Sequence, residues 1–113
     1  MKTRAAVLHQ MQLVRPYSHS APLKIEEVNL DDPGYNEVLI KIRAAGLCHS
    51  DLSVIDGNRP RPLPIALGHE AAGEIVSLGK GVKKFAVGDH VVFAFLPSCG
   101  SCSFCQTGKA ALC

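Results

Sequence analysis

VLIKIRA, at residues 38–44, is the stretch that predicts the fold most clearly. Ile40 and Ile42 fall on one side of an extended chain, and the lysine and arginine that follow them fall on the other, because successive side chains of a strand point to opposite faces. This alternation is typical of a half-buried strand. The sequence Asp-Asp-Pro-Gly at residues 31–34 is a strong turn signal, so we expect the chain to reverse just before this strand.

Further short strands are predicted on both sides of this stretch, from apolar or partly alternating runs at residues 2–9, 23–30, 74–78 and 90–95. Residues 50–55 predict one or two helical turns, with Ser50 as the cap and Gly57 as the stop. Residues 59–64, Arg-Pro-Arg-Pro-Leu-Pro, predict a stiff extended loop because proline fixes φ and lacks an N–H donor. Several short strands with little helix predict a small, mainly β, barrel-like domain.

Composition excludes several classes of partner. A chain of 113 residues suits one domain, and 12 basic against 10 acidic side chains give no reason to expect nucleic acid or an acidic membrane surface. Aromatic residues make up only 5%, which also argues against base stacking. No run approaches the roughly 20 apolar residues of a membrane span, and the N-terminus does not resemble an export signal. The sequence therefore predicts a cytoplasmic protein that binds neither nucleic acid nor membrane.

Four cysteines, Cys99, Cys102, Cys105 and Cys113, are spaced as C-x2-C-x2-C-x7-C. In a reducing compartment, and with an odd total of five cysteines, such a cluster favours metal binding over disulfides. Four thiolates form a closed tetrahedral site for a structural zinc, with no position open for chemistry. Two alternatives remain. The cysteines are free or buried without metal, or they hold an iron–sulfur cluster, although the x7 gap does not match the bacterial ferredoxin spacing.

A second, incomplete metal site is indicated by Cys48 and His69, with Glu70 as a possible carboxylate ligand. A catalytic zinc takes three protein ligands and keeps one position open, where it lowers the pKa of a bound oxygen. Asp51 is a candidate acceptor for the second N–H of the histidine, and Ser50 is a candidate to pass on a proton. The alternative is that the cysteine is a small core residue and the histidine a hydrogen-bonding loop residue.

Three motifs together resemble the zinc-dependent medium-chain alcohol dehydrogenases. Residues 68–73, Gly-His-Glu-Ala-Ala-Gly, with Gly79 and Val82, resemble the zinc signature of that family. Residues 46–51 resemble its first catalytic-zinc segment, and the four cysteines resemble its structural-zinc lobe in order and spacing. Residues 87–91 resemble its glycine-aspartate turn, although a valine stands where proline is more usual.

The resemblance implies a GroES-like, partly open β-barrel, with residues 1–113 as a single, partial catalytic domain and residues 97–113 as the structural-zinc lobe. It implies that Cys48 and His69 bind a catalytic zinc, with Glu70 as an alternate or outer ligand. By the same resemblance Ser50 begins a proton relay, Asp51 orients the histidine, and His49 contacts the cofactor pyrophosphate. Some members carry a relay histidine at the position of Ser53, so the exit of the proton is open.

The resemblance further implies an oxidoreductase that oxidises a zinc-bound alcohol to an aldehyde or ketone by hydride transfer to NAD or NADP, and that is a homo-oligomer at full length. A Rossmann domain with its Gly-x-Gly-x-x-Gly turn and a third zinc ligand are not found in these residues, and the chain ends on a zinc ligand. We therefore expect a fragment that is inactive by itself. The alternative function is a stand-alone zinc-binding structural or interaction module.

Overall fold

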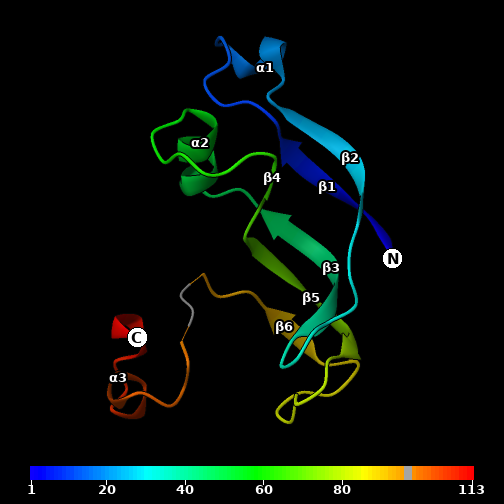
Figure 1. The fold of residues 1–113 in the computed structure, drawn as a ribbon, viewed down its shortest axis with the longest axis vertical. Helices are drawn as coiled ribbons and strands as arrows, with labels where there is room; N and C mark the ends of the chain where they lie inside the picture. Colours follow the sequence, from blue (N-terminus) through cyan, green and yellow to red (C-terminus); the bar gives the residue numbers. More distant parts are fainter. Residues whose placement is uncertain (96–97) are drawn as a thin grey trace.

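The computed structural model describes residues 1–95 and 98–113. Figure 1 shows two sheets arranged along the long axis, with a small lobe beside the lower one. The elements in chain order are β1 (Lys2–Leu8), α1 (Tyr17–Ser20), β2 (Leu23–Asn29), β3 (Val38–Gly46), α2 (His49–Ile55), β4 (Ile65–Leu67), β5 (Glu70–Leu78), β6 (His90–Val92), α3 (Ser103–Gln106) and the 3-10 turn η1 (Ala110–Leu112).

The strands form two three-stranded antiparallel sheets, in the orders β2-β1-β4 and β3-β5-β6. In the first sheet, β1 pairs along its whole length with β2, from Lys2 opposite Asn29 to Leu8 opposite Leu23. The second sheet depends on the long pairing of β3 with β5. The predicted mainly β fold with little helix is confirmed, and the sheets are open and do not close into a barrel.

All five predicted strands are present, but their ends differ. β5 begins four residues before the predicted strand at residues 74–78, and β6 ends at Val92, so the predicted extension over 93–95 is wrong. All three residues of β6 pair with β5. Ile42 is 48% exposed, against the prediction of a buried side, because the residue that pairs with it in β5 is Gly73, which has no side chain to cover it.

Four elements were not predicted. The short helix α1 follows Pro16, strand β4 follows the proline loop, and α3 and η1 lie in the cysteine lobe. β4 exists because residues 65–67 pair with the end of β1, a contact between segments distant in sequence. The loop over residues 59–64 contains no helix or strand, as predicted.

Helix α2 begins one residue earlier than predicted. Its N-cap is Cys48, not Ser50, and the carboxylate of Asp51 accepts a hydrogen bond from the Cys48 amide at 3.3 Å. This bond satisfies an amide that the first helical turn leaves without a partner. Gly57 lies just beyond the helix at φ +77°, in agreement with its prediction as the stop. The residue that fixes the helix start, Asp51, also contacts Gly68 and His69 in the turn between β4 and β5.

The hydrophobic core lies where α2 packs on the first sheet. Its buried members are Leu8 of β1 and Val54 and Ile55 of α2. Partly buried side chains surround them: Met11, Tyr17, Leu23, Leu63, Ile65 and Leu67. This packing holds α2 against the segment that joins β4 to β5, and that junction carries the chemical groups described below.

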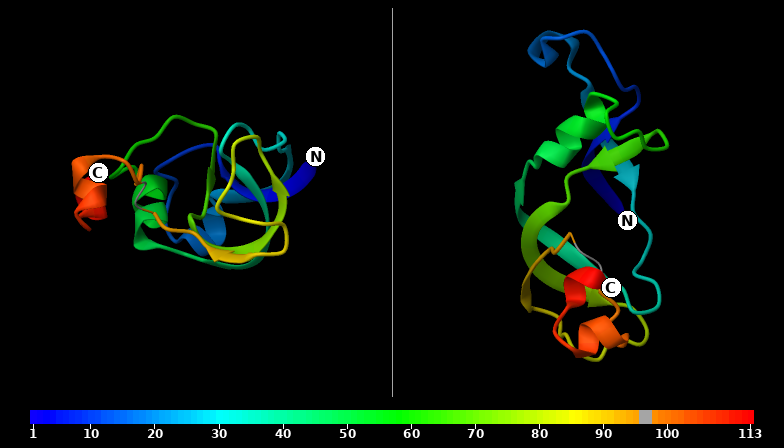
Figure 2. Two further views of the ribbon diagram at one scale, coloured as in Figure 1. Left: turned by 90° about the horizontal axis from the view of Figure 1, so that it is seen from below. Right: turned by 90° about the vertical axis from the view of Figure 1, so that its left-hand side faces the viewer.

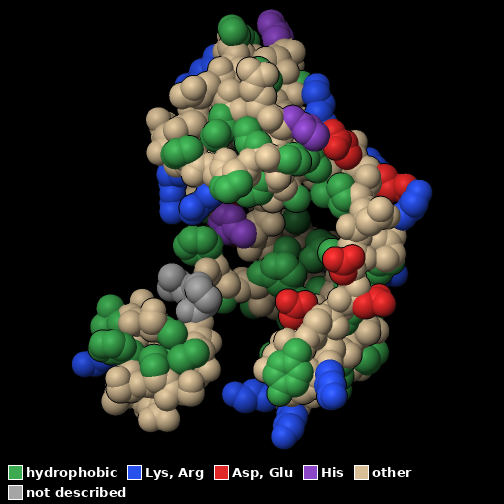
Figure 3. All heavy atoms as spheres, viewed as in Figure 1, with side chains coloured by type: hydrophobic (Ala, Val, Ile, Leu, Met, Phe, Trp, Pro, Cys, Tyr) green, Lys and Arg blue, Asp and Glu red, His purple; other side chains and the backbone are tan. Residues whose placement is uncertain are grey.

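The lobe of residues 98–113 lies on the side of the molecule opposite the N-terminus (Figure 2). In the space-filling view it projects away from the two sheets (Figure 3). None of the helices in the described ranges 1–95 and 98–113 is both long enough and apolar enough to cross a membrane.

Candidate functional site

A buried carboxylate joins α2 to the start of β5. Asp51, only 5% exposed, accepts hydrogen bonds from the amides of Cys48 at 3.3 Å and Gly68 at 3.4 Å. Its Oδ1 atom also lies 3.2 Å from Nδ1 of His69. Gly68 has a φ of +105°, a conformation that favours glycine, and this turn directs the histidine back toward the helix. The orientation of His69 is therefore set by the helix and the turn together.

Three potential metal ligands converge at this junction. A sulfur of Cys48, a ring nitrogen of His69 and a carboxylate oxygen of Glu70 all lie within 4.8 Å of one another. The ligand atoms around a tetrahedral zinc are ~3 to 4 Å apart, so this spacing fits the ion after a small adjustment. Because Nδ1 of the histidine faces Asp51, its Nε2 atom is the nitrogen left for a metal.

Local hydrogen bonds favour the metal-binding form of the thiol. The hydroxyl and amide of Ser50, followed by His69, lower the pKa of the Cys48 thiol. The same contact with Cys48, more than the nearby Asp51 charge, raises the pKa of His69. A thiolate beside an imidazole is the donor pair that a divalent zinc ion binds in place of protons.

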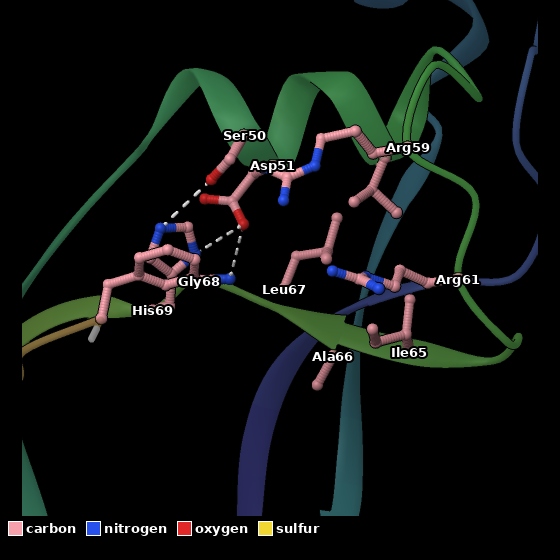
Figure 4. Close-up of a pocket in the computed structure, with 11 residues that line it drawn as sticks. Ser50, Asp51, Arg59, Arg61, Ile65, Ala66, Leu67, Gly68 and His69 are labelled. Atoms are coloured by element: carbon pink, nitrogen blue, oxygen red, sulfur yellow. Dashed lines mark hydrogen bonds and ion pairs between the residues drawn. The ribbon is translucent and has the colours of Figure 1, made fainter. Parts of the chain in front are cut away.

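Ser50 and His69 also line a pocket of about 200 Å³ (Figure 4). The Ser50 hydroxyl is 3.2 Å from Nε2 of the histidine, so it is placed beside the nitrogen that would face a metal. The ring of Phe95 lies 5.2 Å from the histidine ring and adds an apolar wall. Val54, Ile65 and Leu67 contribute further apolar surface to the pocket.

The four lobe cysteines form a second cluster, with all four sulfur atoms within 4.8 Å of one another. A zinc–sulfur bond of ~2.3 Å in a tetrahedron places the sulfurs ~3.8 Å apart, so the residues fit a four-thiolate zinc. The amides of Ser101 and Cys102 donate to the Cys99 sulfur at 3.5 and 3.3 Å, and the Cys99 amide donates to the Cys113 sulfur at 3.3 Å. None of the four is in a disulfide.

These donors change the acidity of the thiols. The hydroxyl and amide of Ser101, then the Cys102 amide, lower the pKa of Cys99 to about 5. Hydrogen bonds with Cys105, first from its amide and then from its side chain, lower the pKa of Cys102. The Gly100 amide acts to lower the pKa of Cys105, but contacts with the neighbouring sulfurs and burial outweigh it, and that pKa is raised. At such distances each thiolate disfavours ionisation of the other three thiols, unless a bound cation neutralises the negative charge.

The structure thus brings together Cys48, Ser50, Asp51, His69 and Glu70 at one junction and the four lobe cysteines at another. His49 is exposed at the first position of α2 and does not line the pocket. Residue 97, the first residue of the predicted lobe, lies outside the described residues.

The pocket also contains residues that the sequence did not single out. Arg59 and Arg61 line it from the proline loop, and Phe95 lines it from the segment after β6. The repeated Arg-Pro of residues 59–62 was a visible signal for the arginines, but no sequence pattern marked the phenylalanine.

Comparison with known proteins identifies the family. The family model described as the alcohol dehydrogenase GroES-like domain matches residues 34–113, which is most of the chain. The chain belongs to this family. The zinc-type, medium-chain alcohol dehydrogenase resemblance inferred from the three motifs is therefore confirmed.

Curated relatives and solved structures of this GroES-like domain agree. The chain is 52% identical to the NDMA-dependent alcohol dehydrogenase of Amycolatopsis methanolica, over 100% of its own length and 28% of the relative. It is 40% identical to an alcohol dehydrogenase zinc-binding domain protein from Burkholderia ambifaria, with a TM-score of 0.86, 100% of this chain and 28% of that chain being covered.

Benzyl alcohol dehydrogenase from Acinetobacter calcoaceticus is 38% identical with a TM-score of 0.84, and the match covers 100% of this chain and 29% of that chain. The chain therefore spans less than a third of the length of these relatives, and it corresponds to the N-terminal domain of an alcohol dehydrogenase-family protein.

Proposed function

We propose that residues 1–113 are the catalytic domain, in part, of a zinc-dependent dehydrogenase that oxidises a small alcohol to an aldehyde or ketone with NAD or NADP. The observation that carries this proposal is the convergence of Cys48, His69 and Glu70 beside the Ser50 hydroxyl. A module that only binds partners through the lobe has no need of this second cluster, so the interaction-module alternative is not favoured.

Zinc bound at this cluster would supply a Lewis acid that lowers the pKa of an alcohol oxygen. The residues of the chain would perform the remaining tasks. Asp51 holds Nδ1 of His69 and so keeps Nε2 directed at the metal position. The Ser50 hydroxyl, beside that nitrogen, accepts the proton that the alcohol loses and donates its own onward. Some family members carry a relay histidine at the position of Ser53, but here the Ser53 hydroxyl donates to the His49 carbonyl at 3.1 Å. Water or a cofactor hydroxyl would therefore take the proton next.

The lobe would bind its own zinc through Cys99, Cys102, Cys105 and Cys113. This ion would stabilise the local fold and take no part in the reaction, because four thiolates leave no open position. The proposal also includes a nicotinamide cofactor, with His49 near its pyrophosphate, and a cytoplasmic homo-oligomer at full length. A Gly-x-Gly-x-x-Gly turn is not found in residues 1–113, so we expect this chain by itself to show no alcohol-dependent cofactor reduction.

The proposal is tested first by counting metal. Elemental mass spectrometry on the chain purified without chelator should give about one zinc, held by the lobe, or about two if Glu70 completes the second site. A chain with four free thiols and no zinc would contradict the lobe site. In the complete dehydrogenase, Cys48→Ser should abolish alcohol-dependent reduction of NAD or NADP. Full activity in that variant would contradict the catalytic role of the cluster.

A further inference from the structure

Two arginines face the candidate active site from the proline loop. Arg59 and Arg61 line the same pocket as Ser50 and His69, and their side chains extend from the loop into it (Figure 4). Val54 of α2 and Ile65 and Leu67 of β4 line the same pocket with apolar side chains. The pocket therefore combines polar groups beside the candidate metal position with two cations from the loop.

The loop that carries the arginines is held in place. The amide of Arg59 donates to the carbonyl of Ser53 in α2 at 3.0 Å, which fixes the start of the loop on the helix. Leu63 packs against the hydrophobic core, and three prolines between residues 60 and 64 restrict the backbone. Guanidinium groups on a constrained loop lose little backbone freedom when a ligand binds, which favours recognition.

The two guanidinium groups have no carboxylate partner among the ion pairs found in residues 1–95 and 98–113. Other arginines differ, because Arg15 pairs with Asp56 and Arg43 pairs with Glu74. The carboxylate in the pocket wall, Asp51, is engaged by His69 and by two backbone amides. The loop end of the pocket therefore carries two cations whose charge is not neutralised within the described part of the chain.

We propose that the substrate of this site is a small alcohol, or the matching aldehyde, that carries an oxyanion, either a carboxylate or a phosphate. Arg59 and Arg61 bind the oxyanion while the reacting oxygen lies beside Ser50 and His69. Guanidinium groups suit this task because they bind carboxylates and phosphates through paired hydrogen bonds. The volume of about 200 Å³ is below the ~300 to 1,000 Å³ of most ligand pockets, and it favours a small substrate. The inference rests on the proposed dehydrogenase function for the reaction, but the oxyanion site has a test of its own.

The test compares substrates in the complete dehydrogenase that contains this domain. Values of kcat/KM are measured for 4-hydroxybutanoate, 2-hydroxyethyl phosphate and the neutral butan-1-ol. In the Arg59→Gln/Arg61→Gln double variant, we expect the ratio of kcat/KM for the preferred anionic alcohol to that for butan-1-ol to fall ~100-fold, mainly through KM. The matched control is Lys83→Gln/Lys84→Gln, which removes the same charge from an exposed segment outside the pocket and should leave the ratio unchanged. Arg59→Lys/Arg61→Lys should retain part of the preference.

Calorimetric binding of butanoate and methylphosphonate is measured alongside, because it needs no turnover. The ligand that binds more tightly identifies the oxyanion: butanoate indicates a carboxylate, and methylphosphonate indicates a phosphate. Loss of this binding in the glutamine variant, with no turnover of any alcohol by the parent enzyme, would support the oxyanion site and contradict the dehydrogenase proposal. The parent enzyme could instead turn over butan-1-ol and both anionic alcohols with equal kcat/KM, and the glutamine variant could leave these values unchanged. That result would overturn the oxyanion site alone.

Discussion

Nδ1 of His69 lies 3.2 Å from Oδ1 of Asp51, and this contact connects the first turn of α2 to the residue before β5. The carboxylate is buried and also accepts hydrogen bonds from the amides of Cys48 and Gly68. One side chain thus orients two candidate zinc ligands, the histidine through its ring and the cysteine through its backbone. A partner of this kind controls both the tautomer and the direction of the ligand.

Replacing Asp51 should weaken metal binding at the candidate active site. We expect Asp51→Asn in the complete dehydrogenase to lower zinc affinity ~10- to 100-fold at that site, because the amide does not hold the imidazole as a carboxylate does. The measurement is a competition titration with a chromophoric chelator. Glu74→Gln is the matched control, since it removes an acidic group that pairs with Arg43 away from the site. An unchanged zinc affinity in Asp51→Asn would show that the contact does not orient the ligand.

Removing the zinc that we propose for the lobe should unfold the lobe and leave the two sheets folded. The lobe is held mainly by contacts between α3, η1 and the cysteine sulfurs, and its four sulfur atoms repel once they are ionised without a cation. We expect chelator treatment to speed proteolytic cleavage within residues 98–113 at least ~10-fold, because an unprotected segment of this kind opens locally. Mass spectrometry of the fragments locates the cleavage.

Cys105→Ser should reproduce the effect of the chelator, whereas Cys48→Ser should not, because Cys48 lies outside the lobe. Equal protease resistance of the lobe with and without zinc would contradict this prediction.

Local patterns were sufficient to predict five of the six strands, and they indicated the residues that the structure gathers into two clusters of potential metal ligands. The alternation around Ile40, the punctuation by Gly and Pro, and the spacing of cysteines all act over a few residues, so the sequence displays them directly. The contact of Asp51 with His69 was suggested only through chemistry and family resemblance. The structure adds the reason for it, which is a glycine turn that reverses the chain toward the helix.

Long-range contacts account for what the sequence did not reveal. Strand β4 is three residues long and is stabilised by pairing with β1, from which some sixty residues separate it. The exposure of Ile42 depends on its partner strand, because the residue opposite it in β5 is Gly73, which has no side chain. Similarly, Phe95 approaches His69 only because the chain after β6 returns toward the site beside α2. None of these features leaves a periodic trace within one segment.

The core between α2 and the first sheet should be sensitive to cavities. Leu8 is fully buried against Val54 and Ile55, so Leu8→Ala removes its contacts and leaves a void. We expect the free energy of unfolding to fall by ~2 to 5 kcal/mol, measured by urea denaturation with zinc present. Val14→Ala is the control, because that side chain is 81% exposed, and it should change stability by less than ~0.5 kcal/mol. A loss below ~1 kcal/mol in Leu8→Ala would place the principal core elsewhere.

Asp56, at the C-terminal end of α2, should make the free energy of unfolding depend on pH. Its carboxylate accepts hydrogen bonds from the Tyr17 hydroxyl and from Arg15, and these contacts, in that order, lower the pKa of Asp56. A carboxyl whose pKa is lower in the folded than in the unfolded state contributes stability above its unfolded pKa of ~4, and that contribution is lost as the pH falls through the folded pKa. We therefore expect parent and Asp56→Asn chains to differ in urea midpoint at pH 6 and to converge as the pH approaches 3.

The control Asp32→Asn removes an exposed carboxyl in the segment between β2 and β3 and should not show this convergence. Tyr17→Phe separates the causes, because it removes the largest of the contacts and leaves Arg15 in place. In that variant the pKa of Asp56, followed by NMR titration of the side-chain carboxyl, should rise toward its ordinary range. A midpoint difference between parent and Asp56→Asn that stays constant from pH 6 to 3 would mean that the carboxylate charge does not stabilise the joint between α1 and α2.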